Sequence, residues 1–345
     1  MLDRDRYWDC LDQAHQASSG GRIEEALAWF DEALRANPDG AEAHSGRGEI
    51  FWDHGRFEEA LREFERAIDV DGELLAAHLN RIELLIEEFG DQDEALDSCD
   101  ALLDLTLDGR TEAEVYYLKA KALFYLDDLD GGLFLLRRAI KVQGEDAVFR
   151  AFEGQILFEM GRYEDARYCL DRALALDSGS AHALYHQALV LEHVGDAKAA
   201  EPLFAQAANL APDVYPLPVR IERAEFDAIA EEAVGALPEE IRRYIANCPV
   251  IVQDLPERDL VQIENISPQV LGLFLGVPAT EPGASPTHGT AVVLHPDRVL
   301  LFKRNLEKIA QSEEDLAEQI QITVKHEIGH FLGLDEDELE RLGLA

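Results

Sequence analysis

The chain has few basic residues and no long apolar run. Its 345 residues include 31 Lys and Arg against 70 Asp and Glu, which gives a formal net charge of -39. An acidic surface repels phosphate groups, so this balance argues against nucleic acid or an anionic membrane as a partner. No stretch approaches the ~20 apolar residues of a membrane span, and the charged start of the chain lacks the apolar core of a signal peptide.

Cysteine is also scarce. The four cysteines lie far apart and form no C-x-x-C pair; they are Cys10, Cys99, Cys169 and Cys248. This usage argues against a disulfide framework and predicts reduced, mostly buried thiols. We therefore expect a cytoplasmic protein.

Residues 7–214 repeat at a period near 34. Small residues mark the register, and bulky ones recur with them. The small positions are Ala26, Ala33, Ala60, Ala67, Ala166, Ala173, Ala200 and Ala207, and the bulky ones are Phe30, Phe64, Leu170 and Phe204. A Gly-containing turn recurs inside four of the units, at Gly21, Gly55, Gly161 and Gly195. This pattern predicts stacked helical hairpins whose small residues let neighbouring helices approach closely.

These repeats resemble tetratricopeptide repeats, in six units at about 7–40, 41–74, 75–111, 113–146, 147–180 and 181–214. The third and fourth units depart from the pattern, because Gly132 replaces the usual alanine and 105–111 adds residues. The resemblance implies a protein or peptide partner on the concave surface. The alternative is that the stack only supports the C-terminal part or mediates self-association.

Five histidines of the repeat region are interpreted as packed or solvated residues, not ligands: His44, His78, His182, His186 and His193. Three prolines in 212–218 then end the helical pattern. We predict a repeat domain at 1–214, a linker at 215–221 and a second domain at 222–345.

The second domain contains the motif H-E-x-x-H from His326 to His330. Residues four apart share a helix face, so the two imidazoles can bind one zinc ion. Glu327 can reach a metal-bound water without being a ligand, which is the position of the general base in peptidases with this motif. A core stripe on the opposite face recurs every four residues, at Leu316, Ile320, Val324 and Ile328.

Gly333 permits a turn that returns a third ligand to the metal. We predict Glu336 as this ligand, because it is the eleventh residue from His326. Asp335 is the alternative, although it also suits the start of a short final helix at 336–342. A more distant group stays open as well.

Around this motif the sequence predicts a small α+β domain. Helices are expected at 222–236, 238–247, 305–311 and 312–332, and strands at 249–254, 290–294 and 299–303, with a short apolar stretch at 270–275.

From Phe226 onward the chain resembles the minimal zincin-like metallopeptidase domain of bacterial proteins. The resemblance rests on 237–240, 272–278, 294–302 and 324–334. It implies a zincin fold with His326 and His330 on zinc and Glu327 as the catalytic residue, and it supports an acidic third ligand at Glu336. The overall fold class is thus mostly α, an N-terminal solenoid of helical hairpins plus a small α+β zincin-like domain.

Two functions follow from these patterns. The first is a zinc-dependent peptidase whose strand at 290–294 binds an extended peptide substrate, with His288, His295 or Tyr244 as candidate donors to the oxyanion. The second is a tetratricopeptide adaptor that keeps zinc for structure or sensing. An intact Glu327 favours the peptidase, because a structural zinc site needs no general base and closes with four ligands.

Overall fold

The computed structural model describes residues 4–245, 248–276, 297–334 and 341. The chain divides into two compact units, 1–149 and 150–345, which are described in turn. No helix in these ranges is long and apolar enough to span a bilayer. All four cysteines are buried thiols, as the sequence predicts.

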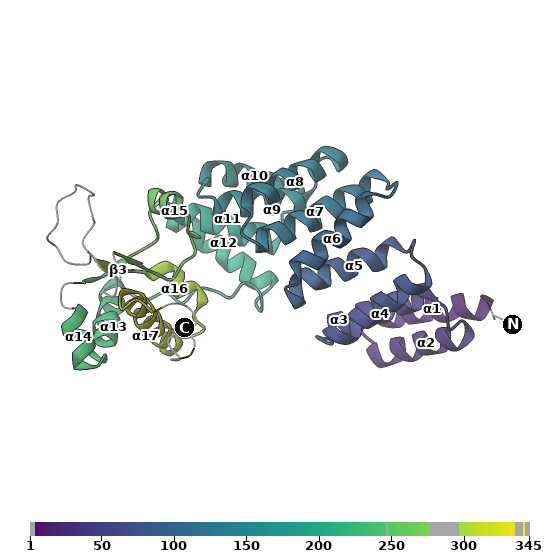
Figure 1. The fold of residues 1–345 in the computed structure, drawn as a ribbon, viewed down its shortest axis with the longest axis horizontal. Coiled ribbons are helices and arrows are strands. Elements are labelled where there is room, and N and C mark those ends of the chain that lie inside the picture. The colour runs from purple at the N-terminus through teal and green to yellow at the C-terminus, as the bar shows by residue number, and fades with distance from the viewer. Residues whose placement is uncertain (1–3, 246–247, 277–296, 335–340, 342–345) are drawn as a thin grey trace. The chain divides into compact units, whose positions relative to one another are not determined.

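The first unit is built from consecutive helical pairs that stack side by side (Figure 1). The helices are α1 (Arg4–Ser19), α2 (Ile23–Ala36), α3 (Ala41–Asp53), α4 (Phe57–Val70), α5 (Leu75–Leu84), η1 (Leu85–Phe89), α6 (Gln92–Leu103), α7 (Gly109–Tyr125) and α8 (Leu129–Gln143).

Small residues bring these helices together. A Cβ atom on Gly46 would lie 2.5 Å from Cζ of Phe30, and one on Gly48 would lie 2.6 Å from Cε1 of Phe64. Both phenylalanine rings are fully buried as a result. The aromatic residues that mark the repeat in the sequence are therefore the ones that fill the space between helices.

The turns inside the pairs use glycine for its conformational freedom. Gly55 has φ 69° and Gly161 has φ 68°, values that other residues rarely adopt. The recurring glycine in the sequence therefore marks the left-handed residue that ends the first helix of a pair.

The third pair contains a π-helical turn that the sequence analysis missed. Helix α5 continues into η1, and the Gly90 amide donates to the Leu85 carbonyl, five residues earlier. A π turn holds one residue more than an α-helical turn. It thus contributes to the irregular spacing of this unit.

The second unit begins inside α9 and contains the H-E-x-x-H motif. Its helices are α9 (Ala147–Glu159), α10 (Tyr163–Leu176), α11 (Ala181–His193), α12 (Ala197–Leu210), α13 (Arg223–Gly235), α14 (Glu239–Tyr244), α15 (Arg258–Glu264), α16 (Lys303–Ile309) and α17 (Glu313–Phe331). Its strands are β1 (Val250–Gln253), β2 (Gly272–Leu275) and β3 (Arg298–Phe302).

The three described strands form one sheet in the order β1-β3-β2. Strand β1 pairs with β3 in parallel, and β2 pairs with β3 antiparallel, with Gly272 opposite Leu301. The central strand β3 is the most buried, with Val299, Leu301 and Phe302 fully covered.

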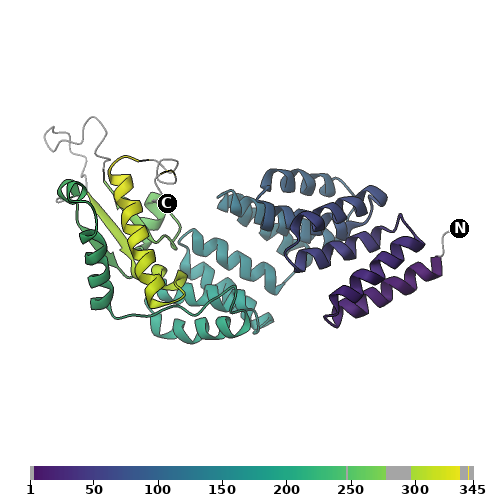
Figure 2. The ribbon, with the colours of Figure 1, turned by 90° about the horizontal axis from the view of Figure 1, so that it is seen from below.

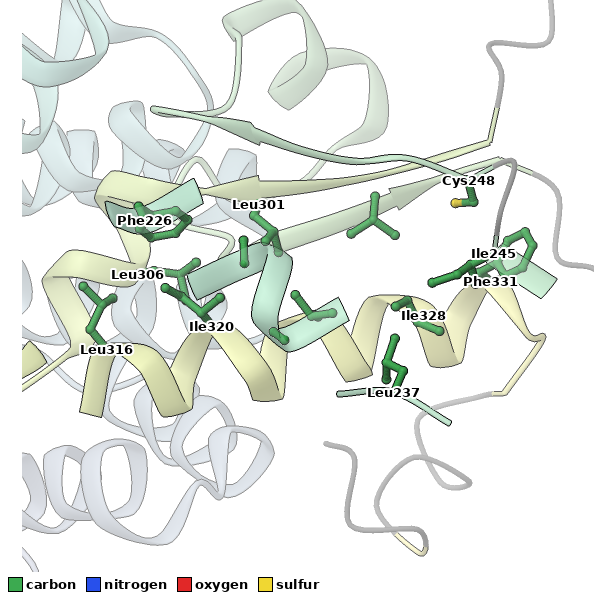
Figure 3. Packing of buried hydrophobic residues seen from close by; sticks show 14 of the residues in the cluster. Phe226, Leu237, Ile245, Cys248, Leu301, Leu306, Leu316, Ile320, Ile328 and Phe331 are labelled. Atoms are coloured by element: carbon green, nitrogen blue, oxygen red, sulfur yellow. The ribbon is translucent and has the colours of Figure 1, made fainter. Parts of the chain in front are cut away.

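Helix α17 runs alongside this sheet (Figure 2). Leu316, Ile320 and Ile328 point from α17 toward the sheet, where they join a core with Leu301 and Phe226 of α13 (Figure 3). The predicted stripe is thus the face of α17 that packs in the core. His326 and His330 lie on a different face of the helix.

Some of the helices and strands predicted for the second domain agree with the structure, and others do not. Helices α13 and α17 lie within a residue of their predicted bounds, whereas α14 is described only as Glu239–Tyr244 and α15 was not predicted. The predicted strand at 290–294 lies outside the described residues. The final helix at 336–342 also falls there, except for the helical residue Arg341.

The segment at 215–221 is tied to both of its neighbours. Tyr215 stacks on Tyr185 with ring centroids 4.8 Å apart, and the Val219 amide donates to the Glu307 carbonyl at 2.8 Å. The division into a repeat domain, a linker and a C-terminal domain stays a prediction.

Candidate metal centre

Two histidine side chains meet on the last turns of α17. The Nε2 atoms of His326 and His330 lie 3.0 Å apart, and their ring centroids are separated by 4.6 Å. At the opposite, N-terminal end of α17, Ser312 caps the helix by accepting from the Asp315 amide at 3.1 Å.

This spacing suits a shared metal ion. Zinc binds imidazole nitrogen at about 2.1 Å, so two ligands at a tetrahedral angle lie roughly 3.4 Å apart. Nδ1 of His330 is 3.3 Å from the Leu334 carbonyl oxygen. A hydrogen bond there places the proton on Nδ1 and leaves Nε2 as the metal-binding atom.

The third ligand cannot be placed from the same contacts. Within the described ranges, no group of three or more His, Cys, Asp or Glu side chains is arranged to hold a metal. Asp335 and Glu336 lie outside those ranges. Their assignment as the third ligand stays a prediction.

Glu327 is buried between α17 and the sheet, with 7% of its surface exposed. A Cβ atom on Gly272, the first residue of β2, would lie 2.8 Å from Cγ and 2.9 Å from Oε1 of Glu327. It would also lie 2.7 Å from Cγ2 of Thr323. The carboxylate therefore rests against strand backbone at a point where only glycine fits.

The role of Gly272 was not predicted from the sequence. The residue belongs to a stretch that carries the zincin resemblance, but its contact with Glu327 spans 55 positions of the chain. The available signal was a glycine at the head of a short apolar strand, which often marks the close approach of another group.

The other candidate residues contribute less to this centre. His288, His295 and the side chain of Tyr244 lie outside the described residues. Nδ1 of His186 lies 2.9 Å from the His182 carbonyl oxygen, and burial lowers the pKa of His186 to about 3. His186 is thus a neutral packed residue, as expected from the sequence.

Comparison with known proteins supports both halves of this description. The family model described as zincin-like metallopeptidase matches residues 245–344, and a tetratricopeptide-repeat model matches 11–73, 50–108 and 153–214. The resemblance to these two families is therefore confirmed, as is the mostly α fold class with its helical solenoid and small α+β domain.

Solved structures share the repeat fold at low identity. The PilF protein of Pseudomonas aeruginosa matches with a TM-score of 0.52 and 17% identity, over 65% of this chain and 98% of its own. The type IV pilus biogenesis factor PilW gives a TM-score of 0.53 and 17% identity, over 60% and 94%. At this identity the likeness shows the fold alone. A search of curated proteins finds no match to this chain.

Proposed function

We propose that this chain, a tetratricopeptide array joined to a zincin-like domain, is a zinc-dependent peptidase. The observation that carries the proposal is the position of Glu327. Glu327 directly follows His326, whose Nε2 lies 3.0 Å from Nε2 of His330, and strand β2 covers its carboxylate.

The predicted ligands are His326, His330 and Glu336, with Asp335 as the alternative to Glu336. Bound zinc supplies a Lewis acid that lowers the pKa of water to about 7 and leaves a coordination position open. The nitrogen spacing fits this ion. A carboxylate from the turn after Gly333 would complete a three-ligand site.

Glu327 has the chemistry of a general base in this arrangement. Its carboxylate takes a proton from the attacking water and passes it to the leaving amine. Burial against β2 limits the directions in which the side chain can point. Holding the base in one orientation lowers the entropy cost of the transition state.

The repeat array suggests that the protein also binds a protein or peptide, because stacked helical hairpins form extended binding surfaces. We propose that this partner occupies the concave surface and that the substrate is a peptide. Nucleic acid and membrane are not proposed as partners, given the net charge of -39.

The decisive experiment compares wild type with Glu327→Gln in metal analysis and in cleavage of a peptide library. The variant should keep about one zinc per chain and lose hydrolysis by about 100-fold or more, because general acid–base catalysis contributes roughly 10²- to 10⁴-fold. Glu318→Gln, on an exposed position of the same helix, is the matched control and should retain both.

Two results would overturn the proposal. Hydrolysis retained in Glu327→Gln would reject the assigned base. Zinc binding without hydrolysis by wild type would favour the adaptor with a structural or sensory zinc site.

A further inference from the structure

Each of the five residues before strand β2 makes a hydrogen bond to another element of the second unit. Residues 267–271 connect α15 to β2 and lie between α9 on one side and α16 on the other. Side chains or carbonyls of all five residues are engaged with groups elsewhere in the second unit. We call these residues the β2 lead segment.

From one side, Glu159 binds the lead segment with both carboxylate oxygens. Ser267 donates its hydroxyl to Oε2 at 2.6 Å, and the side-chain amide of Gln269 donates from Nε2 to Oε1 at 2.6 Å. Glu159 is the last residue of α9, in the fifth helical pair. Charge-assisted hydrogen bonds of this length are stronger than those between neutral groups.

From the other side, Asn305 of α16 binds the backbone of the same segment. Its side-chain amide donates to the Pro268 carbonyl at 2.9 Å and to the Val270 carbonyl at 2.7 Å. Asn305 is only 2% exposed. The Phe302 amide donates to the Leu271 carbonyl at 2.9 Å, so the last residue of the segment is fixed as well.

The β2 lead segment immediately precedes Gly272, the residue that lies against the candidate base Glu327. Gly272 follows Leu271, and a Cβ atom at Gly272 would lie 2.9 Å from Oε1 of Glu327. A displacement of the segment moves Gly272 along or away from α17. It therefore changes the space that Glu327 occupies.

The two supports are linked through α11, because Phe158 of α9 packs on His193 of α11 with ring centroids 5.2 Å apart. Glu192 on α11 accepts hydrogen bonds from Arg304 at 2.7 Å and Lys308 at 2.9 Å, both on α16. Its side chain is fully buried. Glu159 and Asn305 thus hold the lead segment from elements of a single packed unit.

We infer that Glu159 and Asn305 are positioning residues for Glu327, and that the fifth helical pair is therefore part of the peptidase site. The inference rests on the proposed function. It assigns to a repeat residue a role in hydrolysis that is separate from partner binding.

The test compares Glu159→Ala, Glu159→Gln and Glu164→Ala in the full chain. Glu164 is the matched control, because it pairs with Arg258 of α15 at 2.7 Å but does not contact the lead segment. The measurements are zinc content, amide hydrogen exchange over 269–275, and kcat and KM for a library peptide that wild type cleaves.

We expect Glu159→Ala to keep zinc, because no predicted ligand is touched. Exchange over 269–275 should rise about tenfold or more, and kcat should fall about tenfold or more with KM within about twofold, since small misplacement of a catalytic group is costly. Glu159→Gln should recover much of kcat, because its side-chain oxygen still accepts one hydrogen bond. Glu164→Ala should resemble wild type.

Wild-type kcat and exchange in Glu159→Ala would overturn the inference, as would an equal loss in Glu164→Ala. If Glu159→Ala fails to fold, Ser267→Ala and Gln269→Ala each remove one of the two hydrogen bonds and replace it in the test. If wild type cleaves no peptide, the proposed function fails, and unchanged exchange in Glu159→Ala would separately refute the positioning role.

Discussion

At the scale of single residues, the position of Glu327 depends on the absence of a side chain opposite it. Gly272 brings strand backbone into contact with the Glu327 carboxylate, and Thr323 closes the same space one turn earlier on α17. A base that can point in few directions needs little reorganisation before proton transfer. The glycine therefore belongs to the site even though it carries no functional group.

Gly272→Ala should reduce hydrolysis by about 10- to 100-fold, because the new methyl group would lie 2.9 Å from Oε1 of Glu327 and force the carboxylate to move. Zinc content should change little. Steady-state kinetics and metal analysis check both expectations. Gly235→Ala, where a Cβ atom meets nothing within 4 Å, is the control and should leave kcat unchanged. Wild-type kcat in Gly272→Ala would show that the contact has no catalytic role.

The third metal ligand is also decided at this scale. Glu336→Ala should weaken zinc binding by at least about tenfold, because even outer-shell partners of metal ligands contribute 10- to 100-fold. Asp335→Ala should bind zinc nearly as wild type does. Competition with a chromophoric chelator measures both affinities. The reverse order would make Asp335 the ligand, and two unchanged variants would place the ligand farther along the chain.

The sequence predicts some of these residues and not others for a physical reason. His326, Glu327 and His330 are related by the helical repeat, so their shared region follows from spacing alone. The bonds from Ser267 and Gln269 to Glu159 join residues 108 and 110 positions apart. No local periodicity encodes such contacts, and only the packed fold brings the groups together.

At the scale of elements, α17 supports the site through its buried face. Its core stripe packs on the sheet and α13, which fixes the rotation of the helix about its axis. The same rotation turns the histidines away from the core. Packing and metal binding are therefore properties of one helix with two faces.

Ile320→Ala should lower the free energy of unfolding of the second unit by about 2–5 kcal/mol, because the side chain is fully buried and its removal leaves a cavity. Urea unfolding measures the change. Glu318→Ala, two positions away and exposed, should stay within about 0.5 kcal/mol of wild type. A loss of less than about 0.5 kcal/mol in Ile320→Ala would mean that burial of the core stripe does not stabilise α17.

Element predictions succeed where the hydrophobic period is long. Helix α17 has a stripe over 13 positions and a capping serine, so both its type and its start follow from sequence. Helix α15 has seven residues with Val261 as its buried residue, which is too short to establish a period. The π turn η1 has five residues and no periodic signal of its own.

At the scale of the whole molecule, a buried ionic cluster joins the last helical pair to the C-terminal elements. Glu192 of α11 accepts from Arg220, Arg304 and Lys308 at 2.7, 2.7 and 2.9 Å. Glu307 of α16 accepts from Arg220 at 2.9 Å and from the Ile221 amide at 3.1 Å. The repeats of the second unit are thus bonded to the candidate peptidase domain through its interior.

Glu192→Gln should destabilise the second unit by about 3–5 kcal/mol, because it leaves buried cations without their partner. Thermal and urea unfolding of the full chain measure the loss. Glu201→Gln is the control: Glu201 pairs with the same Arg220 at 3.1 Å and Arg304 at 3.6 Å, but its side chain is 43% exposed. Its loss should stay within about 1 kcal/mol. If both variants lose the same unfolding free energy, burial of Glu192 is not the reason that its ion pairs stabilise the unit.

The same cluster predicts a pH dependence. Burial alone would raise the pKa of Glu192, but Lys308 and Arg220 outweigh it and hold the pKa below its ordinary value. The unfolded chain then binds the proton more readily than the folded one, so the stabilisation is complete above about pH 4.3 and is lost as pH falls through the folded pKa. The difference in unfolding free energy between wild type and Glu192→Gln should therefore narrow below about pH 4. A difference that stays constant as the pH is lowered through this range would mean that Glu192 is not held ionised by its three cations.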